Sequence, residues 1–403
     1  MRKSFDYIVF ILMLAFTTFE YFFREDRLFF ALGFYTMIMS IHRGIYRRYN
    51  IETPIAFVCI MSIWFVIQLA FLPHFSFMQV VSPILIYAIA ISLSVIVKER
   101  FVAIFVKGVY YISVISLVLY LLCLNTSIRD FLINTITPYF TSLNVETAVF
   151  EGGGKNFIIY NFVSGGEVLE STGLLRNCGP FWEPGMFAVF LNIALFLHNV
   201  IEKQNLKWCN LVLISALVTT FSAGGFVAGL FVLLSYAVAT SKKNYFISII
   251  GIVLFVFLSQ YVMKLEYVGE KVVDQIENTE EGSDISRFGA FLTQLSMIEN
   301  SPILGGEKLS DYVIDKRGTL ASGTLLPIVT YGIPFGAFYL MVMLLSMIRL
   351  SIAYGKGRIE GILLFLLLLF LSFSQTILLT NWMIVMIFVG LVKKKETSYE
   401  RQL

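Results

Sequence analysis

VAIFVKGVYYISVISLVLYLLCL, residues 102–124, is the stretch of sequence that decides the class of fold. Only Lys107 in this run carries a charge. A helix rises about 1.5 Å per residue and the apolar core of a bilayer is about 30 Å thick, so the run is long enough to cross a membrane. Its apolar residues are continuous and do not alternate with polar ones, which predicts a helix and excludes a membrane β-barrel.

The composition of the whole chain agrees with this stretch. Of the 403 residues, 58% are hydrophobic and only 14% are charged, and the mean hydropathy is +0.80. Soluble domains have about 25% charged and roughly 45–50% apolar residues. This composition excludes a soluble enzyme, a nucleic-acid-binding domain and a disordered protein. We therefore expect an all-α integral membrane protein in which residues 1–403 form a single polytopic membrane domain.

The same length criterion predicts about 12 transmembrane helices. The predicted spans are 7–23, 28–42, 54–72, 79–97, 102–124, 184–200, 208–222, 224–240, 245–263, 323–348, 361–376 and 378–392. The first span is not a cleaved signal peptide, because it is rich in aromatic residues and a second span follows at once.

The positions of the basic residues predict the orientation. Short loops rich in Lys and Arg face the cytoplasm, and here they include 43–48, 98–100 and 393–395. An even number of spans then puts both termini in the cytoplasm. The two long connections, 125–183 and 264–322, face the outside, and connections of this length in a compact fold are usually functional.

The first long connection ends in RNCGPFWEPG, residues 176–185. Glu183 precedes a proline, so we expect an extended backbone there and a helix that begins at Pro184. Its carboxylate would lie at the positive end of the helix dipole. Arg176 is close enough in sequence to return to the same place. In the alternative interpretation, Glu183 only caps the helix and Arg176 only binds lipid headgroups.

The second long connection starts with acidic residues and continues as SDISRF, residues 283–288. The apolar residues that follow share one face of a helix, which we expect to lie against the outer membrane interface and to end at Asn300-Ser301-Pro302. Ser283, Asp284 or Ser286 can each cap its start. Arg287 stands in the first turn, where the dipole disfavours a cation, so an anionic partner is expected. An ordinary ion pair with the upstream acidic residues is the alternative.

Arginines from two outer segments suggest a particular kind of ligand. The guanidinium group matches phosphate oxygens with two parallel hydrogen bonds. Arg176 and Arg287 together could therefore hold a diphosphate whose lipid tail stays in the bilayer.

Three segments, 176–195, 286–306 and 322–340, resemble the O-antigen/polysaccharide repeat-unit polymerase family, within the O-antigen polymerase and ligase-like group. The resemblance implies a GT-C-like polymerase/ligase bundle in the bacterial inner membrane. It implies a metal-independent glycosyltransferase without a cofactor, acting in lipopolysaccharide and polysaccharide biosynthesis. Such an enzyme transfers an undecaprenyl-diphosphate-linked glycan onto the terminal sugar of another lipid-linked repeat unit on the periplasmic side.

The resemblance also implies roles for residues. Arg176 and Arg287 would bind the diphosphate and stabilise its departure, and Glu183 would organise the site or activate the acceptor hydroxyl. Trp182 and Ser286 complete the predicted substrate-binding set. A chain-length regulator protein is the expected partner.

Two alternatives of function stay open at this point. Related ligases carry a His-Asn pair where this chain has Ser322-Gly323, and neither long connection contains a histidine, which favours polymerase over O-antigen ligase. A transporter or flippase of lipid-linked oligosaccharide is the other alternative, and it would place charged residues inside the spans.

Further predictions concern packing and thiol chemistry. Gly225 and Gly229 are expected to form a close helix-packing face, and Gln68 and Gln375 to hydrogen-bond between helices. The four cysteines show no metal-binding spacing and are predicted to be free thiols. A Cys123–Cys178 bridge is the alternative.

Overall fold

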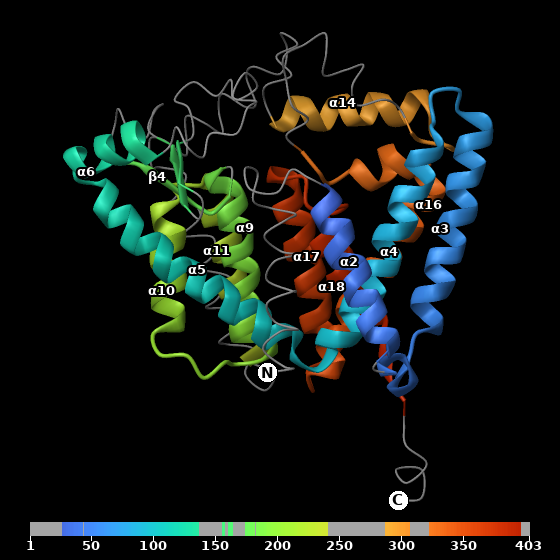
Figure 1. Ribbon diagram of the computed structural model, residues 1–403, viewed down its shortest axis with the longest axis horizontal. Helices are drawn as coiled ribbons and strands as arrows, with labels where there is room; N and C mark the ends of the chain where they lie inside the picture. Colours follow the sequence, from blue (N-terminus) through green and yellow to red (C-terminus); the bar gives the residue numbers. More distant parts are fainter. Residues whose placement is uncertain are drawn as a thin grey trace, which may run out of the picture.

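The computed structural model of the chain describes residues 26–42, 44–136, 155–157, 160–163, 174–181, 183–240, 287–306 and 322–395. It shows a bundle of helices that run side by side between two ends (Figure 1). The predicted spans 7–23 and 245–263 lie outside the described residues.

The described helices occupy the positions of the other ten predicted spans. They are α2 (Asp26–His42), α3 (Glu52–Phe71), α4 (Phe77–Val97), α5 (Phe101–Cys123), α9 (Pro184–Phe196), α10 (Cys209–Thr219), α11 (Ala223–Thr240), α16 (Leu326–Ala353), α17 (Arg358–Ser374) and α18 (Asn381–Leu391). Within the described ranges, 5 helical segments are long and apolar enough to cross a membrane: Glu52–Phe71, Phe77–Cys123, Pro184–Ile201, Ala223–Thr240 and Leu326–Ala353. The chain is thus a mostly helical protein of the membrane type.

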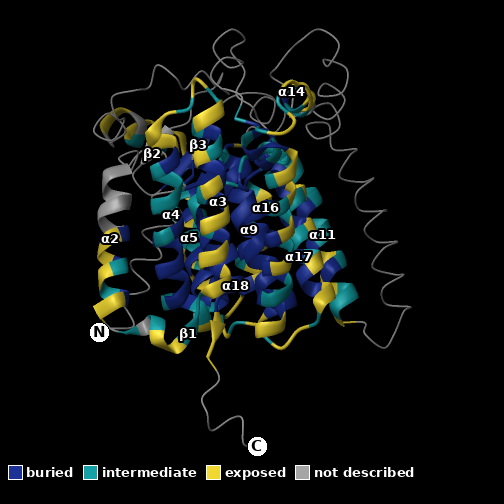
Figure 2. Ribbon diagram, turned by 90° about the vertical axis from the view of Figure 1, so that its right-hand side faces the viewer, coloured by how far each residue is buried: buried dark blue, intermediate teal, exposed yellow. Residues whose placement is uncertain are grey.

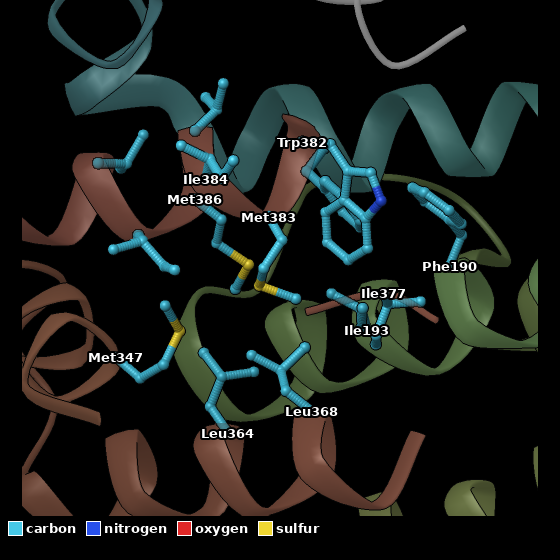
Figure 3. Packing of buried hydrophobic residues seen from close by; sticks show 14 of the residues in the cluster. Phe190, Ile193, Met347, Leu364, Leu368, Ile377, Trp382, Met383, Ile384 and Met386 are labelled. Carbon is cyan, nitrogen blue, oxygen red and sulfur yellow. The ribbon is translucent and has the colours of Figure 1, made fainter. Parts of the chain in front are cut away.

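Helix α9 forms the centre of the bundle. Every residue from Pro184 to Phe196 is buried, as expected for a helix that is apolar on all sides. Phe190 contacts Trp382 of α18, with ring centroids 4.9 Å apart. Side chains from α9, α16, α17 and α18 meet around them (Figure 3), and in Figure 2 the buried residues concentrate along α9.

The outer helices present large apolar side chains outward. Ile63 of α3 is 63% exposed and Leu211 of α10 is 58% exposed. Similar residues lie on α5, α16 and α17. Apolar surface of this extent is rare on soluble monomers, so the surface supports a membrane setting.

The two ends of the bundle differ in chemistry. At one end lie the basic segments, including β1 (Tyr49–Asn50) and β5 (Lys393–Lys394), which pair antiparallel. The opposite end carries α6 (Thr126–Phe131), the strand β4 (Arg176–Gly179) and the helix α14 (Arg287–Asn300) (Figures 1 and 2). This division matches the predicted separation of the basic loops from the two long connections.

The first long connection contains a small sheet that the all-helical prediction missed. Strands β2 (Lys155–Phe157), β3 (Tyr160–Val163) and β4 (Arg176–Gly179) pair antiparallel in the order β2–β3–β4. Runs of three or four residues are too short to show a strand period in the sequence. The sheet is held against α5 by a hydrogen bond of 2.7 Å from Ser116 Oγ to Asn177 Oδ1. Arg176 therefore lies on a strand that is fixed to the bundle.

Helix α16 differs from the single straight span predicted over 323–348, because it is broken at Gly332 (φ 74, ψ 167). A break leaves main-chain groups without their helical partners. The segment 302–306, which follows α14, supplies new ones: Ile333 N donates to Pro302 O (2.8 Å) and Gly306 N donates to Val329 O (2.9 Å). Gln68 bridges both elements, since its Nε2 donates to Leu304 O (2.7 Å) and Thr330 O (2.8 Å). The predicted interhelical role of Gln68 is confirmed.

Candidate functional site

The first turn of α9 forms the centre of the candidate site. Glu183 is the residue before the helix and has an extended backbone (φ -146, ψ 157), and Pro184 takes the first helical position, as predicted. The Glu183 side chain makes no capping hydrogen bond to α9. Its carboxylate therefore stands at the positive end of the helix dipole without serving as an ordinary cap.

Arg176 lies on one flank of this turn. From β4 its side chain reaches the connection between α10 and α11, where Nε donates to Thr220 O (3.4 Å) and Nη2 donates to Phe221 O (3.3 Å). Phe221 has a left-handed backbone (φ 48), which is strained for a bulky side chain. Arg176 is half-buried. The two hydrogen bonds hold its guanidinium group against the protein, which a side chain that only binds lipid headgroups would not require.

Cys178 lies on β4, two residues after Arg176. Burial raises the pKa of its thiol well above the usual range, while Arg176 lowers the pKa and Glu183 raises it. Both charges therefore act on the thiol of Cys178, which is fully buried. Cys123 and Cys178 are both free thiols.

Close packing brings α11 against this turn. A Cβ on Gly225 would lie 2.6 Å from the Cβ of Ala188, one turn into α9, and Asn192 Nδ2 donates to Gly225 O (3.0 Å). A Cβ on Gly229 would also touch Asn192. The predicted helix-packing role of Gly225 and Gly229 is confirmed, and it explains why the connection that holds Arg176 lies beside α9.

Gln375 lies on the other flank. It follows α17 and is only 5% exposed. A Cβ on Gly185 would lie 2.6 Å from Gln375 Nε2 and 3.6 Å from Glu183 Oε1. The sequence around Gln375 predicts an interhelical hydrogen bond only, because nothing local relates it to Glu183. Arg176, Glu183, Gly185 and Gln375 together are called the α9 entrance below.

A chain of polar contacts leads from Gln375 to α14 (Arg287–Asn300). Gly323 N donates to Ser372 O (2.7 Å), and the hydroxyls of Thr324 and Ser372 are 3.1 Å apart. Gln294 of α14 donates to Ser322 O (2.5 Å). Because Gln375 N also donates to Ser372 O (3.3 Å), hydrogen bonds through Ser372 and residues 322–324 connect Gln375 with Gln294 of α14.

Helix α14 lies across the same end of the bundle, as Figure 1 shows. The predicted amphipathic helix is confirmed, but its packed face carries Ala290, Gln294 and Met297, which are buried. Leu292 and Leu295, on the predicted apolar face, are 41% and 39% exposed. Their exposure leaves an apolar surface on α14 that is turned away from the bundle.

Three predicted site residues have no described side chain. Arg287 is the first residue of α14, but only its backbone is described, and Trp182 and Ser286 lie outside the described residues. The structure thus places Arg176 on β4 and Glu183 at the start of α9, at the end of the bundle where α14 also lies. Among the residues described, no group of three or more His, Cys, Asp or Glu side chains could hold a metal ion.

Fold and site together define a class: a helical protein of the membrane type with a charged and polar cluster at one end of a buried central helix. Comparisons of the chain with models of known protein families, with curated proteins and with solved structures find no match in any of the three.

Proposed function

We propose that the protein is a polysaccharide polymerase that transfers an undecaprenyl-diphosphate-linked glycan onto the terminal sugar of another lipid-linked repeat unit. One observation supports the proposal: Glu183, directly before a central buried helix, and Arg176, on the strand β4, both lie at the end of the bundle where α14 lies. These are two of the three residues to which the family resemblance of the sequence gives catalytic roles.

In the proposed reaction, the bond between the sugar carbon and the diphosphate oxygen breaks, and the acceptor oxygen forms the new bond to that carbon. The departing diphosphate gains negative charge, which fixed guanidinium donors from Arg176 and Arg287 would stabilise. The carboxylate of Glu183 would receive the proton of the acceptor hydroxyl. Charge on the leaving group is thus neutralised by arginine.

The proposed setting is the bacterial inner membrane, with the α9 entrance on the periplasmic side and both termini in the cytoplasm. It is supported by the basic segments at the opposite end of the bundle, since such segments face the cytoplasm. The lipid tail would stay in the bilayer while the diphosphate reaches the α9 entrance. A protein that regulates chain length is the proposed partner.

The test is the polysaccharide pattern of a host that makes this polymer. Arg176→Ala and Arg287→Ala are each expected to leave single-repeat product and to abolish the long-chain ladder. Arg129→Ala is the matched control, because Arg129 lies on α6 at the same end and pairs only loosely with Asp130 (3.8 Å). A normal ladder from both site variants, at wild-type protein levels, would refute the proposal.

A second test uses purified protein. It should polymerise a lipid-diphosphate oligosaccharide in the presence of a chelator. Strict dependence on a divalent metal would contradict the proposed mechanism. Transport of the lipid-linked sugar across vesicles without polymerisation would favour a flippase instead.

A further inference from the structure

Two buried polar atoms beneath α14 have no partner among the residues that the structure describes: Oε1 of Gln294 and Oγ of Ser322. Both residues are fully buried. The orientation of the Gln294 amide follows from chemistry, because the Ser322 carbonyl can only accept a hydrogen bond and so faces the nitrogen. Oε1 therefore points elsewhere and lacks a donor. Native structures contain few such groups, so each requires an explanation.

The surroundings of these two atoms suggest the chemistry of a ligand. Phe291 lies one turn before Gln294 on α14, and its ring centroid is 5.9 Å from that of Phe373. Phe373 is the neighbour of Ser372, which bonds to Gly323. The cluster thus combines an amide oxygen, a hydroxyl and two half-buried rings, all of them neutral.

A sugar matches this combination. Its hydroxyls can donate to an amide oxygen and exchange hydrogen bonds with a serine, and its C–H faces are apolar enough to pack against aromatic rings. A diphosphate, in contrast, is held by cations and by guanidinium groups above all. The neutral cluster and the arginine side of the α9 entrance therefore suit different parts of the substrates.

We propose that Gln294 and Ser322 form the subsite that binds hydroxyls of the acceptor sugar. This inference rests on the proposed polymerase function. The subsite is linked through Gly323 and Ser372 to the end of α17, whereas Arg176 bonds to the connection between α10 and α11. The Glu183 carboxylate and the Gln375 amide both lie close to Gly185, and Glu183 would then serve as the base for the acceptor hydroxyl.

The route by which a sugar could reach the two atoms follows from their burial. Because both atoms are shielded from solvent and the Gln294 amide bonds to Ser322 O, a sugar could reach them where α14 and Ser322 meet. Movement of α14 away from residues 322–325 would expose both atoms. In the absence of a sugar, a single water molecule could bond to both atoms, and that is the alternative which the experiment has to separate.

Ser322→Ala is the decisive variant, because the Gln294 bond goes to the main-chain carbonyl and survives the substitution. The assay uses purified protein, a lipid-diphosphate-linked repeat as donor, and a soluble repeat-unit oligosaccharide as the varied acceptor. We expect the acceptor KM to rise about fivefold or more, with an unchanged donor KM and a thermal midpoint at or above wild type. Removing a hydroxyl that has no hydrogen-bond partner should not lower the free energy of unfolding.

Ser113→Ala is the matched control. Ser113 is also fully buried, but its hydroxyl donates to Val109 O (2.7 Å), so this variant should lose some thermal stability and keep its acceptor KM. Gln294→Met is the second site variant and should raise the acceptor KM further, because it removes both polar atoms of the amide.

The outcomes distinguish the two proposals. If the wild-type protein transfers no glycan, the polymerase function is overturned and the subsite with it. If the wild type transfers glycan but Ser322→Ala and Gln294→Met leave the acceptor KM unchanged, or raise the donor KM alone, only the subsite is overturned and the two atoms hold water.

Discussion

Alanine at Gly185 would test whether activity depends on the geometry of the α9 entrance. The added Cβ would lie 2.6 Å from Gln375 Nε2, which is 0.8 Å short of the 3.4 Å at which ordinary contact begins. The backbone of α9 is buried along its whole length, so the Gln375 amide has to move. The Cβ would also make an ordinary van der Waals contact with Glu183 Oε1 at 3.6 Å.

The expected magnitude follows from this displacement. A shift of about 1 Å in a catalytic arrangement costs about 10²-fold in rate, so we expect the initial rate of polymerisation to fall about 100-fold. Stability should change much less. Alanine favours a helix over glycine by about 1 kcal/mol, which offsets part of an overpacking cost of about 1–3 kcal/mol. The thermal midpoint should therefore fall by only a few degrees.

The assay is chain growth by purified protein on a lipid-diphosphate repeat, with Gly108→Ala as the control. Gly108 also lies in a buried helix position, but nothing is within 4 Å of its Cβ position, so Gly108→Ala should keep the wild-type rate. Adding Gln375→Ala to Gly185→Ala should restore the thermal midpoint by removing the clash. A wild-type rate for Gly185→Ala, or an equal loss in both glycine variants, would show that the α9 entrance does not control the reaction.

Three other predictions concern the fold, the thiol and the topology. Gly332→Ala should abolish the peak of folded protein in fluorescence-detected size exclusion, because the added Cβ would overlap main-chain atoms of the segment after α14. Gly355 has nearly the same φ, but its Cβ position is in open space. Gly355→Ala should therefore fold with a small loss of thermal stability. Cys178 should resist iodoacetamide at pH 8 until the protein is denatured, because its thiol is buried and its raised pKa keeps it protonated; prompt labelling of a variant in which serine replaces the other cysteines would contradict this. Thr126 and Asn205 are both exposed and are predicted to lie on opposite sides of the membrane. A cysteine at Thr126 should react with an impermeant maleimide in spheroplasts, and a cysteine at Asn205 should not. The reverse pattern would contradict the predicted topology.

Much of the helical framework could be predicted from local sequence. An apolar run of about 20 residues leaves the backbone few alternatives in a membrane, so its position predicts the helix. The sequence Glu183-Pro184 predicted the first residue of α9, because proline restricts the residue before it and suits the first helical position. In both cases the physical cause lies within a few residues of the feature.

The rest depends on contacts between distant segments. The place of Gln375 beside Glu183 comes from the packing of α17 against α9, and the break at Gly332 depends on main-chain bonds to residues 302–306. The packed face of α14 was also not evident, because buried Gln294 interrupts its apolar pattern. A polar residue within a packed face gives no signal until its partner, here Ser322, is known.

The join between residues 302–306 and the broken helix α16 is made largely by main-chain atoms. Most side chains in the segment can therefore change during evolution without loss of the join. The glycines cannot, since Gly305, Gly306 and Gly332 all have positive φ, and a Cβ on Gly305 or Gly332 would overlap main-chain atoms. Distant relatives are expected to share only a few glycines at set intervals in these segments. The join can therefore be conserved in structure after nearly all recognisable sequence identity has been lost.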